Sequence, residues 1–477
     1  MTSVGHPRGR GARLLANTAV FSVGKLLSKL LVFFMTRLYT ACLSPAEYST
    51  ADLIVNAANL IIPLACVGIS EGIFRNAADR SADKEAYFTN GLLVLGLGSL
   101  AFLALSPLIG LVPMLAGSVW LIVLYVLSAN LHAVVSQYLC AIGRTKLFAG
   151  QGLLNTALVV SLNVLFLPVL GLGVEGFVLS IILADALTTL FLFFFTRLWR
   201  AIKPRSISGA TIRSMLAFCL PLVPTTIFWW ITGVSDRYMV AAMVSEEVNG
   251  LYTAAYKIPT LLIYVVSIFD SAWKLSVASE SDPEETRRFY SRVWRIYTAV
   301  AFIGGGALML SCRIFASVLF ADGYAAAWVY IPILTAATVF TALDTFLGSV
   351  YFAGRKTAWS MITAFVGALL NVALNLALIP TWGAMGASFA TFVSYFAVCV
   401  LRLVTTHRLI PFERGILRGV CNTVALGLMT VAVTFAEGDH GAVMWGLAGV
   451  AYAAILALNA RAVLDILKDA RRLIRNR

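Results

Sequence analysis

Long apolar runs separated by short polar segments dominate the chain. A helix needs roughly 20 mostly apolar residues to cross a hydrocarbon core of about 30 Å. Fourteen runs meet that length, with approximate limits 14–37, 51–69, 88–111, 117–142, 147–168, 176–196, 215–235, 250–272, 293–315, 327–353, 359–380, 384–404, 415–436 and 441–462. The pattern predicts an all-α polytopic membrane protein with about 14 transmembrane helices.

Composition supports a membrane protein. Of 477 residues, 60% are hydrophobic and 12% are charged, and the mean hydropathy is +0.87. The net charge of +13 would suggest nucleic acid as a partner of a soluble protein. Here 30 of the 36 Lys and Arg residues fall in alternate segments, beginning with the N-terminal arm. The positive-inside rule then places both termini of a multi-pass protein in the cytoplasm, and this distribution explains the positive charge without a nucleic-acid partner.

The sequence also repeats itself. Gly143-Arg144-Thr145-Lys146 matches Gly354-Arg355-Lys356-Thr357, and NVLFLP (163–168) recurs as NLALIP (375–380). Six predicted helices separate the copies, so both halves have the same orientation, as in transporters with repeats about an axis along the membrane normal. The repeat predicts two lobes around a central cavity. The expected domains are an N-terminal six-helix lobe (1–197), a cytoplasmic amphipathic linker (198–214), a C-terminal six-helix lobe (215–404), and two further helices with a basic cytoplasmic tail (405–477).

Two prolines open the seventh predicted helix. Pro221 and Pro224 each remove a backbone donor, and they predict a bend or break there. The preceding linker is basic and partly amphipathic, which favours a position along the inner membrane surface.

The first apolar run carries two lysines. Lys25 and Lys29 share one helical face with Thr18, Ser22 and Thr36. A charge near mid-membrane is costly and normally faces a bundle interior or a watery cavity. We interpret the lysines as part of a cationic cavity wall that meets an anionic substrate. Snorkelling to the interface, or a buried pair with an acid on another helix, are the alternatives.

Other predicted spans contain polar faces as well. Asp52 and Asn56 in the second helix are candidate partners for the lysines. The eighth helix carries Tyr252, Tyr256 and Lys274 at steps that place them on one face, with Lys257 on a neighbouring arc. Tyrosine offers an apolar ring and a hydrogen-bonding tip suited to sugars, although Tyr252 by its position is also typical of an interface belt.

Two acids, Asp185 and Asp344, lie within predicted spans. Each could pair with a buried base or relay a proton. The seven cysteines and four histidines have no metal-ligand spacing, and no Walker-type loop or nucleophile elbow is present. The segment 171–176 fits GxGxxG but joins two membrane helices, so we interpret it as a turn. The sequence therefore predicts no catalytic residue, metal or cofactor, and no enzyme.

Several motifs together resemble the polysaccharide-transporter family of oligosaccharide flippases. They are Pro221-Leu222-Val223-Pro224, Trp229-Trp230, Ser235-Asp236-Arg237, Gly250-Leu251-Tyr252, Ala255-Tyr256-Lys257, Gly68 to Arg75, and the Asn-Pro-Gly ends of the repeat. The resemblance implies the fold of multidrug-extrusion transporters, with lobes that open alternately to either side. It implies transfer of a polyprenyl-pyrophosphate-linked oligosaccharide from the inner to the outer leaflet, with a polymerase and glycosyltransferases of the same pathway as possible partners.

The lysine stripe agrees with an anionic lipid-linked substrate. We expect Lys25 and Lys29 to meet the pyrophosphate, with Arg75, Lys257 and Lys274 as further candidates. Asp52, Asn56 and Tyr256 are the expected sugar contacts. The alternatives are a cation-coupled drug antiporter of the same fold, which should carry acidic rather than basic cavity residues, and a lipid II flippase of the same superfamily. A membrane glycosyltransferase or polymerase should show a large outer loop, and the longest here is about 236–249.

Overall fold

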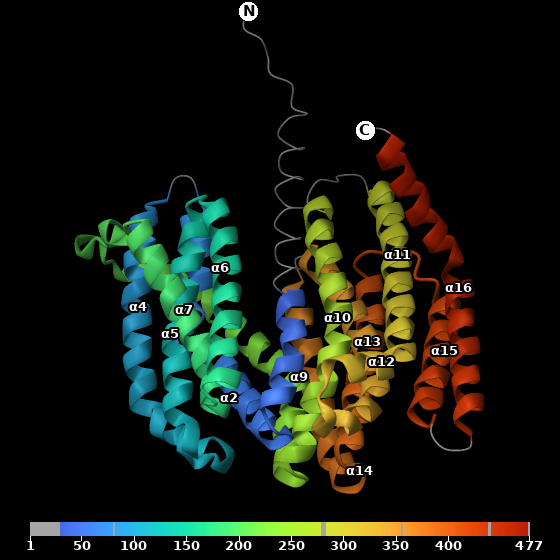
Figure 1. Cartoon of the computed structure of the whole chain (residues 1–477). Coiled ribbons are helices and arrows are strands. Elements are labelled where there is room, and N and C mark those ends of the chain that lie inside the picture. Colours follow the sequence, from blue (N-terminus) through green and yellow to red (C-terminus); the bar gives the residue numbers. More distant parts are fainter. Residues whose placement is uncertain (1–28, 80–81, 278–282, 354–355, 437–439, 476–477) are drawn as a thin grey trace, which may run out of the picture. The chain divides into compact units, whose positions relative to one another are not determined.

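The chain folds into helices joined by short turns (Figure 1). A computed structural model describes residues 29–79, 82–277, 283–353, 356–436 and 440–475, and these ranges contain no strand. Ten of their helices are long and apolar enough to cross a membrane, or eleven when one bent pair is counted as a span. The all-α polytopic prediction is confirmed, whereas the count of fourteen is not. Part of the difference concerns α14 (Thr357–His407), in which the predicted spans 359–380 and 384–404 follow each other across a kink at Gly383 and are counted as one.

Contacts between helices divide the chain into two compact units, one up to Trp230 and the other from Ile231. The first contains a helical stretch at 29–42. It continues with α2 (Pro45–Ala65), α3 (Ile69–Ala77), α4 (Lys84–Leu105), η1 (Ser106–Leu111), η2 (Pro113–Ser118), α5 (Val119–Ala141), α6 (Thr145–Val164), η3 (Leu165–Val169), α7 (Gly173–Phe195), η4 (Leu198–Ala201), η5 (Pro204–Ser206) and α8 (Gly209–Cys219). The boundary between the units falls inside α9 (Leu222–Met243).

The second unit contains the remaining helices. They are α10 (Glu246–Val277), α11 (Pro283–Leu310), α12 (Cys312–Leu319), η6 (Asp322–Tyr330), α13 (Ile331–Ala353), α14, α15 (Ile416–Thr434) and α16 (Gly441–Arg475). Helices α15 and α16 pack against each other and against α11, as the red and yellow ribbons in Figure 1 show. The two helices beyond the predicted twelve are therefore part of the packing of this unit.

The second predicted span is a bent pair of helices. Ser44 and Glu47 cap α2 reciprocally, because the Glu47 N–H donates to Ser44 Oγ at 3.3 Å and the Ser44 N–H donates to Glu47 Oε2 at 2.8 Å. Val67 and Gly68 then adopt positive φ values of 52° and 62°, which end the helix. Helix α3 continues at 54° to α2, so the helix predicted at 51–69 ends at Ala65 and a second element, which was not predicted, begins at Ile69.

The two copies of the internal repeat turn in the same way. Pro168 lies in the short π-helix η3, and Pro380 lies inside α14. A few residues later Gly171 and Gly383 adopt positive φ values of 63° and 55°. Only glycine takes such values without a steric cost, which explains why both copies place it after the proline.

The basic linker is tied to the first unit by side chains of α4. Asn90 donates to the Ser206 carbonyl at 3.0 Å and accepts from the Ser208 N–H at 2.9 Å. Thr89 Oγ1 accepts from the Lys203 N–H at 2.9 Å. Glu85 accepts a hydrogen bond from the Lys203 ammonium group, and this bond raises the pKa of Lys203. Helix α8 ends at Cys219 and α9 begins at Leu222, which confirms the break predicted from the two prolines.

Candidate functional site

A buried polar network in the second unit is centred on Asp236, whose side chain is fully buried in α9. Its Oδ2 accepts hydrogen bonds from the hydroxyls of Tyr252 at 2.6 Å, Tyr256 at 3.0 Å and Thr391 at 3.1 Å. Its Oδ1 accepts from the Arg237 N–H at 2.9 Å. Four donors thus surround one carboxylate and connect α9, α10 and α14.

The network continues along α14. Asn371 Nδ2 donates to Thr391 Oγ1 at 3.4 Å, and Asn371 Oδ1 accepts from Asn375 at 2.9 Å and from Ser235 at 3.4 Å. Asn371 and Asn375 precede the kink at Gly383 and Thr391 follows it. Both halves of α14 therefore contribute side chains to the network. Asn375 Oδ1 has no hydrogen-bond partner among the described residues.

Aromatic rings and a guanidinium group lie beside the Asp236 carboxylate. The guanidinium of Arg237 lies 4.7 Å from the centre of the Tyr256 ring, a cation–π contact. Tyr252 and Tyr256 meet edge to face with ring centroids 5.2 Å apart. Hydroxyl, amide and carboxylate groups thus meet two aromatic rings and a guanidinium inside the unit, where they bond to one another.

The first unit holds the predicted pair Asp52 and Asn56 on α2. Asn56 Nδ2 donates to Asp52 Oδ2 at 2.8 Å and to the Asp52 carbonyl at 2.8 Å. Trp230 Nε1 donates to the Asn56 carbonyl at 2.9 Å. Asp52 is 8% exposed and Asn56 is half-buried. They share a helical face as the spacing predicted, and their contacts with the lysines and with sugar stay predictions.

The other predicted residues are distributed over several elements. Lys29 is half-buried in the helix at 29–42, and Lys257 is half-buried in α10. Arg75 is exposed on α3, and its guanidinium lies 4.2 Å from the centre of the Phe218 ring of α8. Lys25 and the side chain of Lys274 lie outside the described residues. The structure therefore joins Asp52 to Asn56 and Tyr256 to Asp236, while Arg75 packs on an aromatic ring.

Asp185, one of the two acids predicted inside spans, lies in a polar cluster of the first unit. Asp185 Oδ1 accepts from Asn155 Nδ2 at 2.8 Å. His132 Nδ1 lies 3.2 Å from Thr189 Oγ1. The cluster joins α5, α6 and α7.

Asp344 has a different environment in the second unit. Its side chain is 1% exposed, and neither carboxylate oxygen has a hydrogen-bond partner among the described residues. The guanidinium of Arg402, also 1% exposed, donates through Nη1 to the main-chain carbonyl of Asp344 at 2.9 Å and through Nε to Thr363 Oγ1 at 3.1 Å. Asp344 thus has a buried base, Arg402, beside it. These two hydrogen bonds of Arg402 go to a main-chain carbonyl and to a hydroxyl rather than to the Asp344 carboxylate.

Sequence reasoning did not identify the centre of the Asp236 network. Asp236 entered only through the motif Ser235-Asp236-Arg237, and Thr391 and Asn371 gave no signal. Tyr252 is fully buried, so the interface-belt interpretation of this residue is wrong. The available signal was the spacing of Tyr252 and Tyr256, which puts both hydroxyls on one helical face.

The long apolar helices of the described residues define a multi-pass membrane protein. The chain belongs to the polysaccharide biosynthesis protein family, whose model matches residues 14–274, more than half of the sequence. No curated protein matches the sequence significantly.

Solved structures of MOP-superfamily transporters and of a flippase share this fold. An inward-facing multidrug resistance MATE family transporter of the MOP superfamily has a TM-score of 0.69 and 16% identity, covering 80% of this chain and 94% of its own. The lipid II flippase MurJ in an inward closed conformation has a TM-score of 0.67 and 15% identity, covering 94% of this chain and 100% of its own. A MOP superfamily transporter from Pyrococcus furiosus has a TM-score of 0.62 and 16% identity, covering 83% and 95%.

The chain is therefore a member of the polysaccharide biosynthesis protein family with the fold of these transporters and of this flippase.

Proposed function

We propose that the protein moves a polyprenyl-pyrophosphate-linked oligosaccharide from the inner to the outer leaflet by alternating access, for the synthesis of a cell-surface polysaccharide. The observation that carries this proposal is the extent of the family match. Residues 14–274 contain all eight predicted substrate-binding residues, from Lys25 to Lys274. The segment that matches the polysaccharide biosynthesis family is thus the one that carries the predicted basic and polar contacts.

The charges of the substrate and of the helices are complementary. A pyrophosphate and a sugar head cannot cross hydrocarbon unaided, because each polar group that loses water without a new partner costs free energy. Lys25 and Lys29 would meet the pyrophosphate, with Arg75, Lys257 and Lys274 as further cationic contacts. Asp52, Asn56 and Tyr256 would exchange hydrogen bonds with sugar hydroxyls. A membrane potential that is negative inside favours outward movement of the anion by about 2.3 kcal/mol per charge per 100 mV.

The proposal includes orientation and partners. The distribution of Lys and Arg supports cytoplasmic termini in a bacterial inner membrane. A lipid-linked glycan must be built by glycosyltransferases on the inner side and consumed on the outer side, for example by a polymerase, so these enzymes are the expected functional partners.

A cation-coupled drug antiporter is the competing function, because multidrug transporters share the fold. The Pyrococcus furiosus transporter provides a useful parallel, since reverse polarity of its binding pocket suggests a different function. Basic residues on the first helix of the present chain favour an anionic substrate by the same reasoning. A lipid II flippase is the second alternative, because the lipid II flippase MurJ also shares the fold.

Translocation in proteoliposomes tests the proposal directly. The intact protein should move a fluorescent or radiolabelled prenyl-pyrophosphate oligosaccharide, and the Lys25→Ala, Lys29→Ala double variant should lose most of that transport. The matched control is Arg144→Ala, Lys146→Ala, which removes two exposed charges from the start of α6 and should transport normally.

Two results would reject the assignment. Normal transport by the lysine double variant at equal protein levels would remove those lysines from the substrate path. Efflux of organic cations without movement of any prenyl-pyrophosphate substrate would identify an antiporter.

A further inference from the structure

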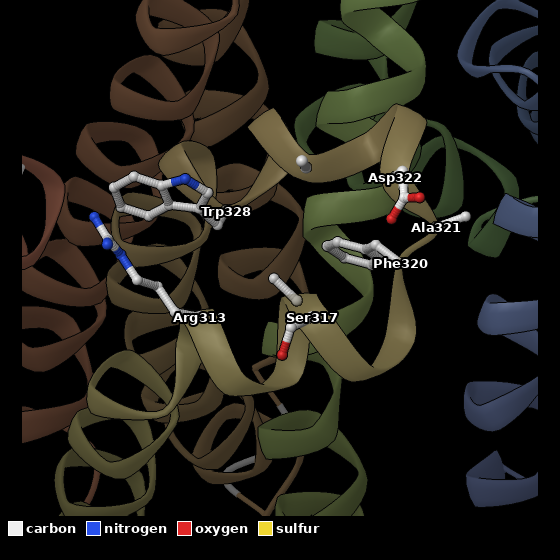
Figure 2. Close-up of a pocket in the computed structure, with 8 residues that line it drawn as sticks. Arg313, Ser317, Phe320, Ala321, Asp322 and Trp328 are labelled. Carbon is white, nitrogen blue, oxygen red and sulfur yellow. The ribbon is translucent and has the colours of Figure 1, made fainter.

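A pocket of about 380 Å³ lies in the second unit where α12 and η6 connect α11 to α13. Figure 2 shows Arg313 beside Trp328 on one side of it, Asp322 on the other, and Ser317 and Phe320 between them. The helices on either side of this connection are long and apolar enough to span a membrane. The pocket therefore lies at a membrane face, which the positive-inside rule predicts to be the outer one.

Helix α12 presents three different faces over its eight residues. Cys312, Ala316 and Leu319 are buried in the unit. Ile314 and Val318, four residues apart, are 67% and 60% exposed, which is typical of a helix whose apolar face enters the lipid boundary. Arg313 and Ser317, also four residues apart, face the pocket. One short helix thus places exposed aliphatic side chains directly beside the pocket.

The cationic side of the pocket is held by aromatic rings. The Arg313 guanidinium lies 4.1 Å from the centre of the Trp328 ring and 5.8 Å from that of Trp445 in α16. Its Nη2 donates to the Ala436 carbonyl at 3.0 Å. A guanidinium carries five N–H donors in a fixed plane that suits phosphate oxygens. The indoles and this bond fix its orientation, while tryptophans at this level are typical of the lipid headgroup region.

The opposite side of the pocket carries a negative charge. Asp322 is the first residue of η6 and is exposed, and no described residue forms an ion pair with its carboxylate. The pocket thus offers a cation and an anion on separate walls, with the apolar ring of Phe320 between them (Figure 2).

We propose that this pocket binds the headgroup of a phospholipid that carries both a phosphate and a primary ammonium group, the chemistry of phosphatidylethanolamine. Arg313 binds the phosphate, Asp322 and Ser317 accept hydrogen bonds from the ammonium group, and the acyl chains lie along Ile314 and Val318. The exported pyrophosphate product fits less well, because it carries several negative charges and would meet the Asp322 carboxylate. This site is independent of the proposed substrate path.

The test is native mass spectrometry of the delipidated full chain in detergent, with phosphatidylethanolamine, phosphatidylglycerol and phosphatidylcholine of identical acyl chains. The intact protein should bind phosphatidylethanolamine most strongly. Arg313→Gln should weaken binding of phosphatidylethanolamine and phosphatidylglycerol about tenfold, the size expected for a lost charge-assisted hydrogen bond. Arg313→Lys should restore part of it, because the charge remains.

Asp322→Asn separates charge recognition from general lipid binding. Phosphatidylethanolamine should bind this variant no more strongly than phosphatidylglycerol, whose affinity should not fall. Asp322 is exposed, so this variant remains informative even when Arg313→Gln fails to fold. The control is Arg288→Gln, an arginine of α11 paired with Glu284 and 83% exposed, which should bind all three lipids as the intact protein does.

Three outcomes would overturn the proposal. They are equal binding of phosphatidylethanolamine and phosphatidylglycerol by the intact protein, unchanged lipid binding by folded Arg313→Gln, and displacement of bound phosphatidylethanolamine by equimolar polyprenyl pyrophosphate or by free glycan. The last result would instead mark a product or sugar site.

Discussion

Two buried acids of the second unit have opposite surroundings. Asp236 receives four hydrogen bonds from three helices. Asp344 receives none among the described residues, although the buried Arg402 lies beside it and donates to its main-chain carbonyl. Both side chains are at most 1% exposed. Burial alone therefore does not define the role of an acid in a membrane helix, because the number of donors that meet it differs so widely.

The difference has an energetic meaning. A buried polar group with its partners in place contributes modestly to stability, whereas removal of one partner leaves the other groups unsatisfied at a high cost. Asp236 is the acceptor on which three hydroxyl groups depend, so its loss affects all of them. The carboxylate of Asp344 accepts no such hydrogen bond from the described residues, so its loss leaves none of their donors unsatisfied. Asp185 in the first unit, with one described donor, provides an intermediate case.

Replacement of Asp236 should have the largest effect. Asp236→Ala leaves the hydroxyls of Tyr252, Tyr256 and Thr391 without this acceptor, and each buried donor left unsatisfied costs about 1–3 kcal/mol. We expect the free energy of unfolding to fall by about 3 kcal/mol or more, measured by denaturant titration in detergent. Asp236→Asn keeps one carbonyl oxygen as an acceptor, so its free energy of unfolding should fall by less than that of the alanine variant. Equal stability of the alanine variant and the intact protein would show that the network does not stabilise the unit.

Removal of the single donor to Asp185 should have an intermediate effect. Asn155→Ala deletes the 2.8 Å hydrogen bond to Asp185 Oδ1, and the half-buried site lets solvent compensate in part. The expected loss in the same titration is about 1 kcal/mol. The control is Thr156→Val on the same helix, whose hydroxyl bonds only the Gly152 carbonyl one turn earlier, and its stability should not change measurably. If Asn155→Ala lowered the free energy of unfolding as much as Asp236→Ala does, the number of donors would not explain the difference between the acids.

Replacement of Asp344 should have the smallest effect on stability. Asp344→Asn keeps the shape of the side chain and removes no hydrogen bond seen among the described residues, so we expect a change of about 0.5 kcal/mol or less. A double-mutant cycle with Arg402→Gln measures the coupling between the two side chains. A destabilisation that matches Asp236→Asn, together with strong coupling, would instead show that Asp344 and Arg402 act as a buried charge pair.

The fold was largely accessible from the sequence, because hydrophobic runs and turn residues are local signals. The prolines at 221 and 224 predicted the break between α8 and α9, and the repeated Asn-Pro-Gly ends predicted the matching turns at Gly171 and Gly383. The bend of the second span at Val67 and Gly68 was missed, since a non-glycine residue with positive φ has no clear sequence signal. The exact number of spans likewise depends on helix ends, which hydropathy defines poorly.

The candidate site was accessible only in part. Helical spacing placed Asp52 and Asn56 on one face, and the structure joins them by a hydrogen bond that the sequence did not predict. The lysines predicted to contact pyrophosphate stay a prediction that transport must test. Asp236 and Thr391 are 155 residues apart in the chain, and no local period relates them.

The sequence by itself determined that the chain is an all-α membrane protein with a duplicated pattern, because a hydrocarbon environment requires each span to satisfy its own backbone. Only the tertiary structure decided which polar side chains have partners. Helix packing brings Tyr252, Tyr256 and Thr391 to Asp236 and leaves the carboxylate of Asp344 without a described donor. The physical reason is that hydrophobicity is read residue by residue, whereas a hydrogen bond between helices depends on their register and rotation, which the fold sets as a whole.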